Sequence, residues 1–218
     1  MHELYDEFIR YFYEENKEKT VSFIIEKLQK GELDVLDLYS QILTPALNDL
    51  QCSLEEKRIC IWKEHVKTAI ARTVVECAYP YILKKRDSLG VASHGIAVVL
   101  CPPEEYHDLG ARMVADMLTI CGYNTVYVGS NTPYNDFYNA IDYIRPDVIA
   151  ISVSNYYNVI ATKRIIEELR KAIDFEVTIM VGGNAFADDP ERYKITGADR
   201  HAKNLSDIAE IVGCEVVK

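Results

Sequence analysis

The sequence has few of the features that mark membrane-bound or secreted proteins. No uninterrupted apolar run approaches the ~20 residues that a membrane helix needs. The first residues, Met1 to Glu7, are too acidic for a signal or transit peptide. We therefore expect a soluble, cytoplasmic protein with no membrane partner.

Several motifs of known chemistry are also missing. The chain has no phosphate-loop lysine motif and no G-x-G-x-x-G after its first predicted strand, which argues against a nucleotide or nicotinamide enzyme. It has no G-x-S-x-G elbow, which argues against a serine hydrolase. It also has no H-x-x-x-H pair, which argues against a zinc site on a helix.

The sequence lacks a paired cysteine motif, and its acidic residues outnumber its basic ones. No two cysteines form a C-x-x-C pair, and most lie in apolar helix or strand patterns, so we interpret them as buried free thiols: Cys52, Cys60, Cys77, Cys101, Cys121 and Cys214. Lysine and arginine total 24 against 34 aspartates and glutamates, which gives a net charge of −10. Nucleic acids require a basic face, so we expect no direct nucleic-acid partner.

The hydrophobic pattern changes near the middle of the chain, where a charged run beginning at Lys84 and a segment ending at Gly95 interrupt it. Before this point, apolar residues recur at three- and four-residue spacing with little glycine, which is typical of amphipathic helices. The pattern predicts a four-helix bundle, with helices at residues 3–15, 17–30, 33–51 and 55–84. We predict three parts: a helical cap bundle at 1–85, a linker at 86–95 and a second domain at 96–218.

After the linker, apolar strand-like runs alternate with helical patterns, which predicts an α/β domain with a parallel sheet. The expected strands are residues 96–101, 125–129, 147–152, 177–181 and a short one near 198–202. The expected helices are residues 108–121, 133–144, 158–172 and 205–212. Right-handed crossovers would place these helices on both faces of a five-stranded, flavodoxin-like sheet.

The loop after the first predicted strand carries Glu105-Tyr106-His107-Asp108-Leu109-Gly110. Folds of this kind bind ligands at the carboxyl ends of their strands. A histidine there can offer one ring nitrogen to a metal, and Glu105 is placed to hold the other ring N–H. His107 is therefore a candidate metal ligand.

Two further motifs follow the ends of predicted strands: Ser152 and Ser154 after one, and Gly182 with Gly183 after another. The 41 residues 111–151 precede the serines, and the 27 residues 155–181 separate them from the glycines. In this order and spacing, the motifs resemble those of the B12-binding family, Asp-x-His-x-x-Gly, Ser-x-Leu or Ser-x-Thr, and Gly-Gly. The chain departs from that pattern at Glu105 and Ser154.

The resemblance implies bound cobalamin in the base-off form, with its dimethylbenzimidazole tail removed from cobalt and His107 as the lower axial ligand. Gly110 would let the tail pass closely. Ser152 and Ser154 would hydrogen-bond the buried base or the lower loop. Gly182 and Gly183 would leave room for the nucleotide tail, because glycine has no Cβ.

The helical half also has a candidate, the pair Glu64-His65 on its longest predicted helix. This pair resembles one in light-responsive B12 regulators, in which the helical cap lies over the upper face of the corrin. A surface ion pair is the plainer interpretation. Those regulators carry a tryptophan ten residues before the glutamate, where this chain has Leu54, and its single tryptophan is Trp62.

The resemblance leaves the biological role open between a corrinoid carrier in a methyltransferase system and a B12-dependent sensor. Either role needs cobalamin, and methyltransferase or regulator proteins are the expected partners. Both describe a cofactor-binding protein rather than a complete enzyme, and both leave homo-oligomerisation open. The alternative is a protein-interaction module whose B12 site has degenerated, an interpretation supported by Glu105 and Ser154.

Overall fold

The computed structural model describes residues 1–49 and 58–215, and the chain divides into two compact units, Met1–Lys85 and Arg86–Lys218. No helix of the described residues is long and apolar enough to cross a membrane. Leu54 and Cys52, both named above, lie outside the described residues.

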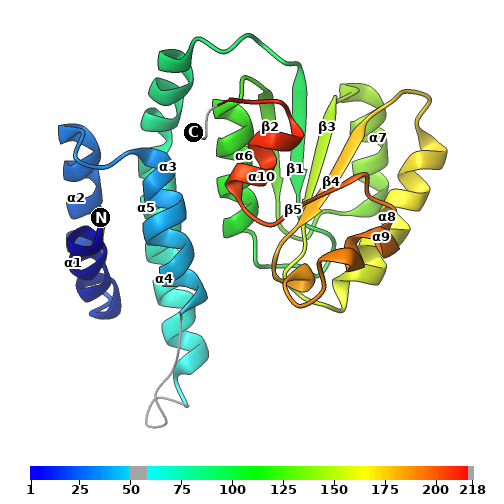
Figure 1. Ribbon diagram of the computed structural model, residues 1–218. Coiled ribbons are helices and arrows are strands. Elements are labelled where there is room, and N and C mark those ends of the chain that lie inside the picture. The colour runs from blue at the N-terminus through cyan, green and yellow to red at the C-terminus, as the bar shows by residue number, and fades with distance from the viewer. Residues whose placement is uncertain (50–57, 216–218) are drawn as a thin grey trace. The chain divides into compact units, whose positions relative to one another are not determined.

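The first unit is helical (Figure 1). Its elements are α1 (His2–Tyr13), α2 (Lys17–Lys30), α3 (Val35–Asp37), the π-helix η1 (Leu38–Leu43), α4 (Thr44–Asn48) and α5 (Cys60–Leu89). The side chain of Asn16 caps α2 by accepting a hydrogen bond from the Lys19 N–H, and Gly31 ends the helix in the left-handed conformation. The predicted four helical segments are therefore present.

The third segment departs from a regular helix at the π-helix. Pro45 has no N–H to donate to the carbonyl four residues earlier, so the regular hydrogen-bond pattern is broken there. The Thr44 hydroxyl instead donates to the Tyr39 carbonyl at 2.7 Å. Tyr39 is fully buried, together with Phe8, Phe12 and Ile24 in the core of this unit.

The predicted linker 86–95 overlaps α5, which continues to Leu89, although the two compact units meet at Lys85 and Arg86. Lys84 and Arg86 suit the surface of a helix, and charge alone does not end one. The chain leaves the helix at Gly90, whose φ of 59° is in the left-handed region.

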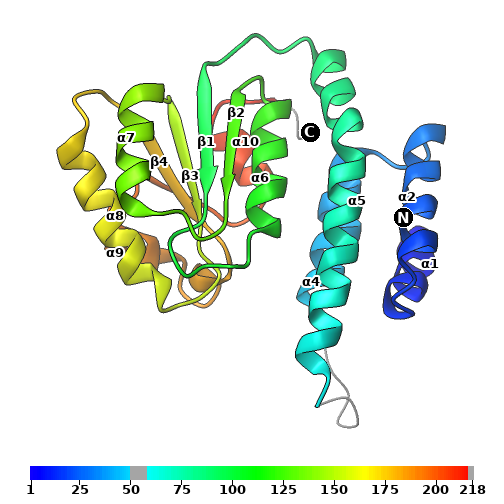
Figure 2. The same cartoon turned by 180° about the vertical axis from the view of Figure 1, so that it is seen from behind.

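The second unit is a doubly wound α/β domain (Figures 1 and 2). Its parallel strands are β1 (Ile96–Leu100), β2 (Asn124–Gly129), β3 (Val148–Ser152), β4 (Thr178–Gly182) and β5 (Arg200–Ala202), in the order β2-β1-β3-β4-β5. Its helices are α6 (Leu109–Ile120), α7 (Tyr134–Ile144), α8 (Asn158–Ala172), α9 (Tyr193–Thr196), α10 (Leu205–Ile211) and the 3₁₀ turns η2 (Asn184–Phe186) and η3 (Pro190–Arg192). This strand order confirms the predicted flavodoxin-like sheet.

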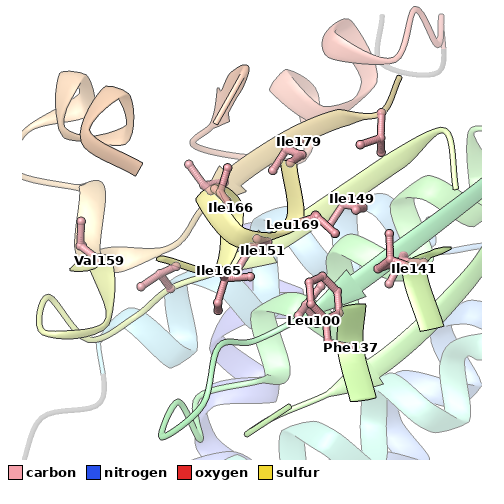
Figure 3. Close-up of a cluster of buried hydrophobic side chains, with 14 of the residues drawn as sticks. Leu100, Phe137, Ile141, Ile149, Ile151, Val159, Ile165, Ile166, Leu169 and Ile179 are labelled. Carbon is pink, nitrogen blue, oxygen red and sulfur yellow. The ribbon is translucent and has the colours of Figure 1, made fainter. Parts of the chain in front are cut away.

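The helices cover both faces of this sheet. α6 and α10 contact each other on one side, and α7, α8 and α9 lie on the other. Between the sheet and α7 and α8, alternate strand residues such as Leu100, Ile149 and Ile151 pack against Phe137 and Ile165 (Figure 3). Alternation follows from the two-residue period of a strand.

The strand order places a topological switch point between β1 and β3. β1 is followed by α6 on one face, whereas β3 is followed by α8 on the opposite face. The chain therefore leaves β1 and β3 in opposite directions at the carboxyl edge of the sheet, and doubly wound folds bind ligands at such a switch point.

Candidate functional site

The loop from β1 to α6 holds a paired glutamate and histidine at this switch point. The Glu105 side chain is 1% exposed, whereas the His107 side chain is 65% exposed. Oε1 of Glu105 lies 2.7 Å from Nδ1 of His107 and also accepts the His107 backbone N–H at 3.2 Å. The buried carboxylate thus holds an exposed imidazole in place.

The other oxygen of Glu105 joins this loop to the loop between β3 and α8. Oε2 accepts hydrogen bonds from the backbone N–H groups of Ser154 at 3.0 Å and Asn155 at 2.8 Å. It also accepts one from the side-chain amide of buried Asn158 at 3.1 Å. One carboxylate therefore connects the two loops that flank the switch point.

These contacts fix the charge of Glu105. Burial by itself raises the pKa of the carboxyl, but the hydrogen bonds from Asn155, His107 and Asn158 together outweigh it and hold the pKa below its ordinary value. An ionised carboxylate can only accept, so Nδ1 of His107 must carry the proton. The proton on Nδ1 leaves Nε2 with a lone pair, which is the form of histidine that binds a metal.

A third loop, between β2 and α7, also meets the His107 loop. The backbone N–H of Asn131 donates to the Glu105 carbonyl at 3.1 Å, and the Asn131 side chain accepts from the Glu104 N–H at 3.0 Å. Glu104 and Asn131 both have positive φ, 61° and 52°. Conformations of this kind cost free energy outside glycine and cluster at functional sites.

The other predicted site residues of this unit lie at the same edge of the sheet. Ser152 is the half-buried last residue of β3, and no hydrogen bond joins it to Glu105 among the described residues. Ser154 contacts Glu105 through its backbone N–H. Gly110 lies in the first turn of α6, exposed, with no atom within 4 Å of the Cβ that a larger residue would add.

Gly182 and Gly183 have a packing role of their own. A Cβ on Gly182 would lie 2.5 Å from the Ala202 carbonyl oxygen. A Cβ on Gly183, whose φ is +105°, would collide with the Val153 carbonyl oxygen. The protein backbone therefore demands glycine at both positions, and their contribution to a nucleotide tail stays a prediction.

Alanine substitutions compare Gly183, where a Cβ would collide with the backbone, with Gly110, where a Cβ would meet no neighbour. We expect Gly183→Ala to lower the free energy of unfolding by about 2–4 kcal/mol, because it adds backbone strain to a steric clash. Gly110→Ala is expected to raise it by about 0.5–1 kcal/mol, because alanine suits a helix and meets no neighbour. Urea denaturation followed by circular dichroism measures both, and equal stabilities would contradict the description of Gly183.

The thiol of Cys101 is not in the ionised form that binds metals. Cys101, which follows β1, is buried, and burial together with the charges of Asp108 and Glu105 raises the pKa of its thiol to about 12. The thiol is therefore protonated at neutral pH. Within the described ranges, no group of three or more His, Cys, Asp or Glu residues is placed to hold a metal ion.

The interpretation of all six cysteines as buried free thiols is wrong for two of them. Cys60 at the start of α5 is disulfide-bonded. Cys77 is free but exposed on α5. The apolar spacing alone did not separate the exposed side of this helix from its buried side. Cys101, Cys121 and Cys214 are buried and free.

Glu64 and His65 lie on α5 in the helical unit. Nδ1 of the exposed His65 side chain is 2.7 Å from the Ile61 carbonyl oxygen, one turn earlier on the same helix. Glu64 is half-buried. Trp62 is 71% exposed on the same stretch of helix.

Three asparagines that contact the Glu105 loop, Asn155, Asn158 and Asn131, were not predicted from the sequence. A signal for Asn158 was present. Asn158 and Thr162 are spaced four apart on the face of α8 that also carries buried Ile165, Ile166 and Leu169. A polar residue on a buried helix face needs a hydrogen-bond partner, and Glu105 is that partner.

Comparisons with known proteins agree with this architecture. The family described as the B12 binding domain matches residues 95–207. The chain is 28% identical over 200 residues to the dimethylamine corrinoid protein of Methanosarcina barkeri, which covers 88% of this chain and 87% of that protein. It is 27% identical over 153 residues to the HTH-type transcriptional repressor CarH of Myxococcus xanthus, which covers 70% of this chain and 49% of the repressor.

A solved structure of similar fold spans the whole chain. The monomethylamine corrinoid protein of Methanosarcina barkeri matches with a TM-score of 0.81 at 20% identity, covering 99% of both chains. At this level of identity the likeness supports the fold, helical unit included.

Proposed function

This chain belongs to the B12 binding domain family, whose cofactor is cobalamin, and from that premise we propose that it holds the corrinoid base-off with His107 as the lower axial ligand. The observation that carries the proposal is the His107 ring itself. Its proton is fixed on Nδ1 by Glu105, and its exposed Nε2 has no hydrogen-bond partner among the described residues. Such a nitrogen is ready to bind a metal.

The residues at the edge of the sheet fit a corrinoid. A cobalt held in a macrocycle needs only one ligand from the protein below the ring, which is what the His107 loop offers. Gly110 leaves open space beside that ligand. At the carboxyl ends of β3 and β4 lie four residues that would border the displaced tail: Ser152, Ser154, Gly182 and Gly183.

The proposed role is that of a corrinoid carrier. Bound cobalamin supplies a cobalt that can hold a methyl group. The protein would orient the cofactor through His107, keep the ligand in its Nδ1-protonated form through Glu105, and present the corrinoid to methyltransferase partners. Similarity to a dimethylamine corrinoid protein over most of both chains favours this role.

Retention of cobalamin tests the proposal directly. The apoprotein is mixed in the dark with hydroxo-, methyl- or adenosylcobalamin, desalted, and examined by absorption spectroscopy before and after illumination. A carrier is expected to retain all three forms, because its lower-face contacts do not depend on the upper ligand. Loss of every form on desalting would contradict the proposal and favour a degenerate interaction module.

A second candidate, a B12-dependent sensor, is favoured by the exposed His65 beside Glu64 and by the similarity to the CarH repressor. In that role we expect selective retention of adenosylcobalamin and a light-induced change in assembly, measured by size-exclusion chromatography. Glu64→Ala and His65→Ala should alter the upper-ligand absorption bands and leave ligation by His107 intact. Retention of all upper-ligand forms with unchanged spectra in both variants would count against the sensor.

A further inference from the structure

Arg192 is held in a fixed position at the carboxyl edge of the sheet. It ends η3 and is half-buried. Its Nη1 donates to the Ala185 carbonyl at 2.6 Å, and its guanidinium lies 4.8 Å from the centre of the Tyr156 ring. A hydrogen bond and a cation–π contact thus restrain one side chain from two sides.

These two contacts place Arg192 between loops that belong to the candidate site. Tyr156 follows Ser154 and Asn155, whose N–H groups bind Glu105. Ala185 follows the glycine pair after β4, and its N–H donates to the Val153 carbonyl at 3.1 Å. The guanidinium therefore lies where the loops after β3 and β4 meet.

The charge of Arg192 has no counterion within the described ranges. Other arginines do pair with carboxylates: Arg10 with Glu7, Arg86 with Asp87, Arg112 with Asp116, Arg145 with Asp174 and Arg170 with Asp199. Arg58, Arg164 and Arg200, for which no ion pair is found in the described part of the chain, are exposed to water. A half-buried, immobilised and unpaired cation is unusual in a protein of net charge −10.

The rest of the guanidinium is available to a ligand. Only Nη1 makes a hydrogen bond to any described residue, so several N–H donors face no protein acceptor. Two such donors on a planar fork match the paired oxygens of a phosphate group, which makes arginine a preferred phosphate ligand. The site is therefore suited to a phosphodiester or phosphate anion.

We propose that Arg192 binds the phosphodiester of the nucleotide tail of a base-off corrinoid, an inference that rests on the proposed function. The tail is expected to enter between the same two loops, past Ser154 and Gly183. Its phosphodiester is the one anionic group between the corrin side chain and the terminal base. Arg192 thereby selects corrinoids that carry a complete nucleotide tail.

Cobinamide, a corrinoid that lacks the whole nucleotide, distinguishes binding of the tail from binding of the corrin ring. Equilibrium dialysis in the dark measures the affinity of the full-length protein for cobalamin and for cobinamide. The variants are Arg192→Ala, Arg192→Lys and the control Arg200→Ala, which removes an exposed arginine whose one hydrogen bond to the described residues is to the neighbouring Asp199 carbonyl. Thermal unfolding of each variant establishes that it is folded.

We expect Arg192→Ala to weaken cobalamin binding by about 10- to 100-fold, because it removes a charge-assisted hydrogen bond to the nucleotide tail. Binding of cobinamide, which has no nucleotide tail, should be unchanged. Arg192→Lys should lie between wild type and alanine, because lysine keeps the charge and loses the planar fork. Arg200→Ala should match wild type. Inorganic phosphate, at matched ionic strength, should compete with cobalamin and not with cobinamide.

Each contrary outcome is distinct. Equal weakening of cobalamin and cobinamide by Arg192→Ala, or no effect on either, would overturn the role of Arg192 and leave the proposed function standing. Phosphate retained by the apoprotein, together with equal cobalamin affinities of wild type and Arg192→Ala, would assign the residue to a free anion instead. Failure of the wild-type protein to retain either corrinoid would overturn the proposed function and this inference together.

Discussion

Replacing His107 by alanine is expected to abolish the histidine-ligated spectrum of the bound corrinoid without unfolding the protein. The His107 side chain is 65% exposed, so its removal creates no cavity. It does take the ring N–H away from Oε1 of buried Glu105, which keeps the His107 backbone N–H, so we expect a loss of about 1 kcal/mol in the free energy of unfolding. It also removes the one Nε2 that the described residues present at the switch point. Absorption spectra, and electron paramagnetic resonance of the cobalt(II) form, measure the loss.

Isotope labelling identifies the ligand nitrogen. A nitrogen bound to paramagnetic cobalt splits each cobalt line, into triplets for ¹⁴N and doublets for ¹⁵N. Protein grown with ¹⁵N-histidine and loaded with unlabelled cobalamin should show doublets, because the ligand is His107 and not the cofactor's own base. Triplets in the labelled protein, or an unchanged spectrum in His107→Ala, would remove the axial-ligand assignment.

Substitution of Glu105 should have a large effect on the stability of the α/β unit. Glu105→Gln replaces one carboxylate oxygen by an NH₂, which meets N–H donors in either orientation. In place of Oε2 it faces Ser154, Asn155 and Asn158, and in place of Oε1 it faces His107. We expect a loss of about 2–4 kcal/mol in the free energy of unfolding. Corrinoid affinity should also fall, because either orientation weakens the contacts through which Glu105 holds His107 in place.

The neighbouring Glu104→Gln is the matched control. Glu104 is exposed, and its side chain makes no hydrogen bond among the described residues, so we expect wild-type stability and wild-type affinity. Urea denaturation and equilibrium dialysis measure the two properties. Should Glu105→Gln unfold at the same urea concentration as Glu104→Gln, the carboxylate would not be what holds the loops together.

Much of the α/β unit could be predicted from the sequence for a physical reason. Strands of a parallel sheet are buried on both faces, so they appear as short continuous apolar runs such as Ile96–Leu100 and Val148–Ser152. Their expected limits differ from the observed ones by only a residue or two. The short β5 was the least accurate, because three residues carry little pattern.

The helical unit was predicted less well because its irregularities depend on packing and hydrogen bonds. A 3.6-residue period is too coarse to reveal a π-helix such as η1 at Leu38–Leu43. The same period could not place the end of α5 among charged residues, where Gly90 was the usable signal. It also could not distinguish buried cysteines from exposed Cys77.

In the candidate site, local pairs could be predicted and distant ones could not. Glu105 and His107 are two residues apart, and their pairing follows from that spacing. The contact between Glu105 and Asn158 spans 53 residues and depends on the β1–β3 pairing, which only the assembled sheet specifies. The assignment of these residues to a corrinoid remains a proposal, which the spectra of His107→Ala test.

The contacts of Glu105 set a limit on protein engineering. Its carboxylate binds the loop after β3, and its carbonyl binds the loop after β2, so one residue takes part in three connections of the sheet. A hexapeptide containing His107, grafted onto another flavodoxin-like scaffold, would arrive without the N–H donors that hold the Glu105 carboxylate, which in turn orients the imidazole. The smallest transferable ligand module is therefore all three loops, carried on the β2-β1-β3 strands that align them.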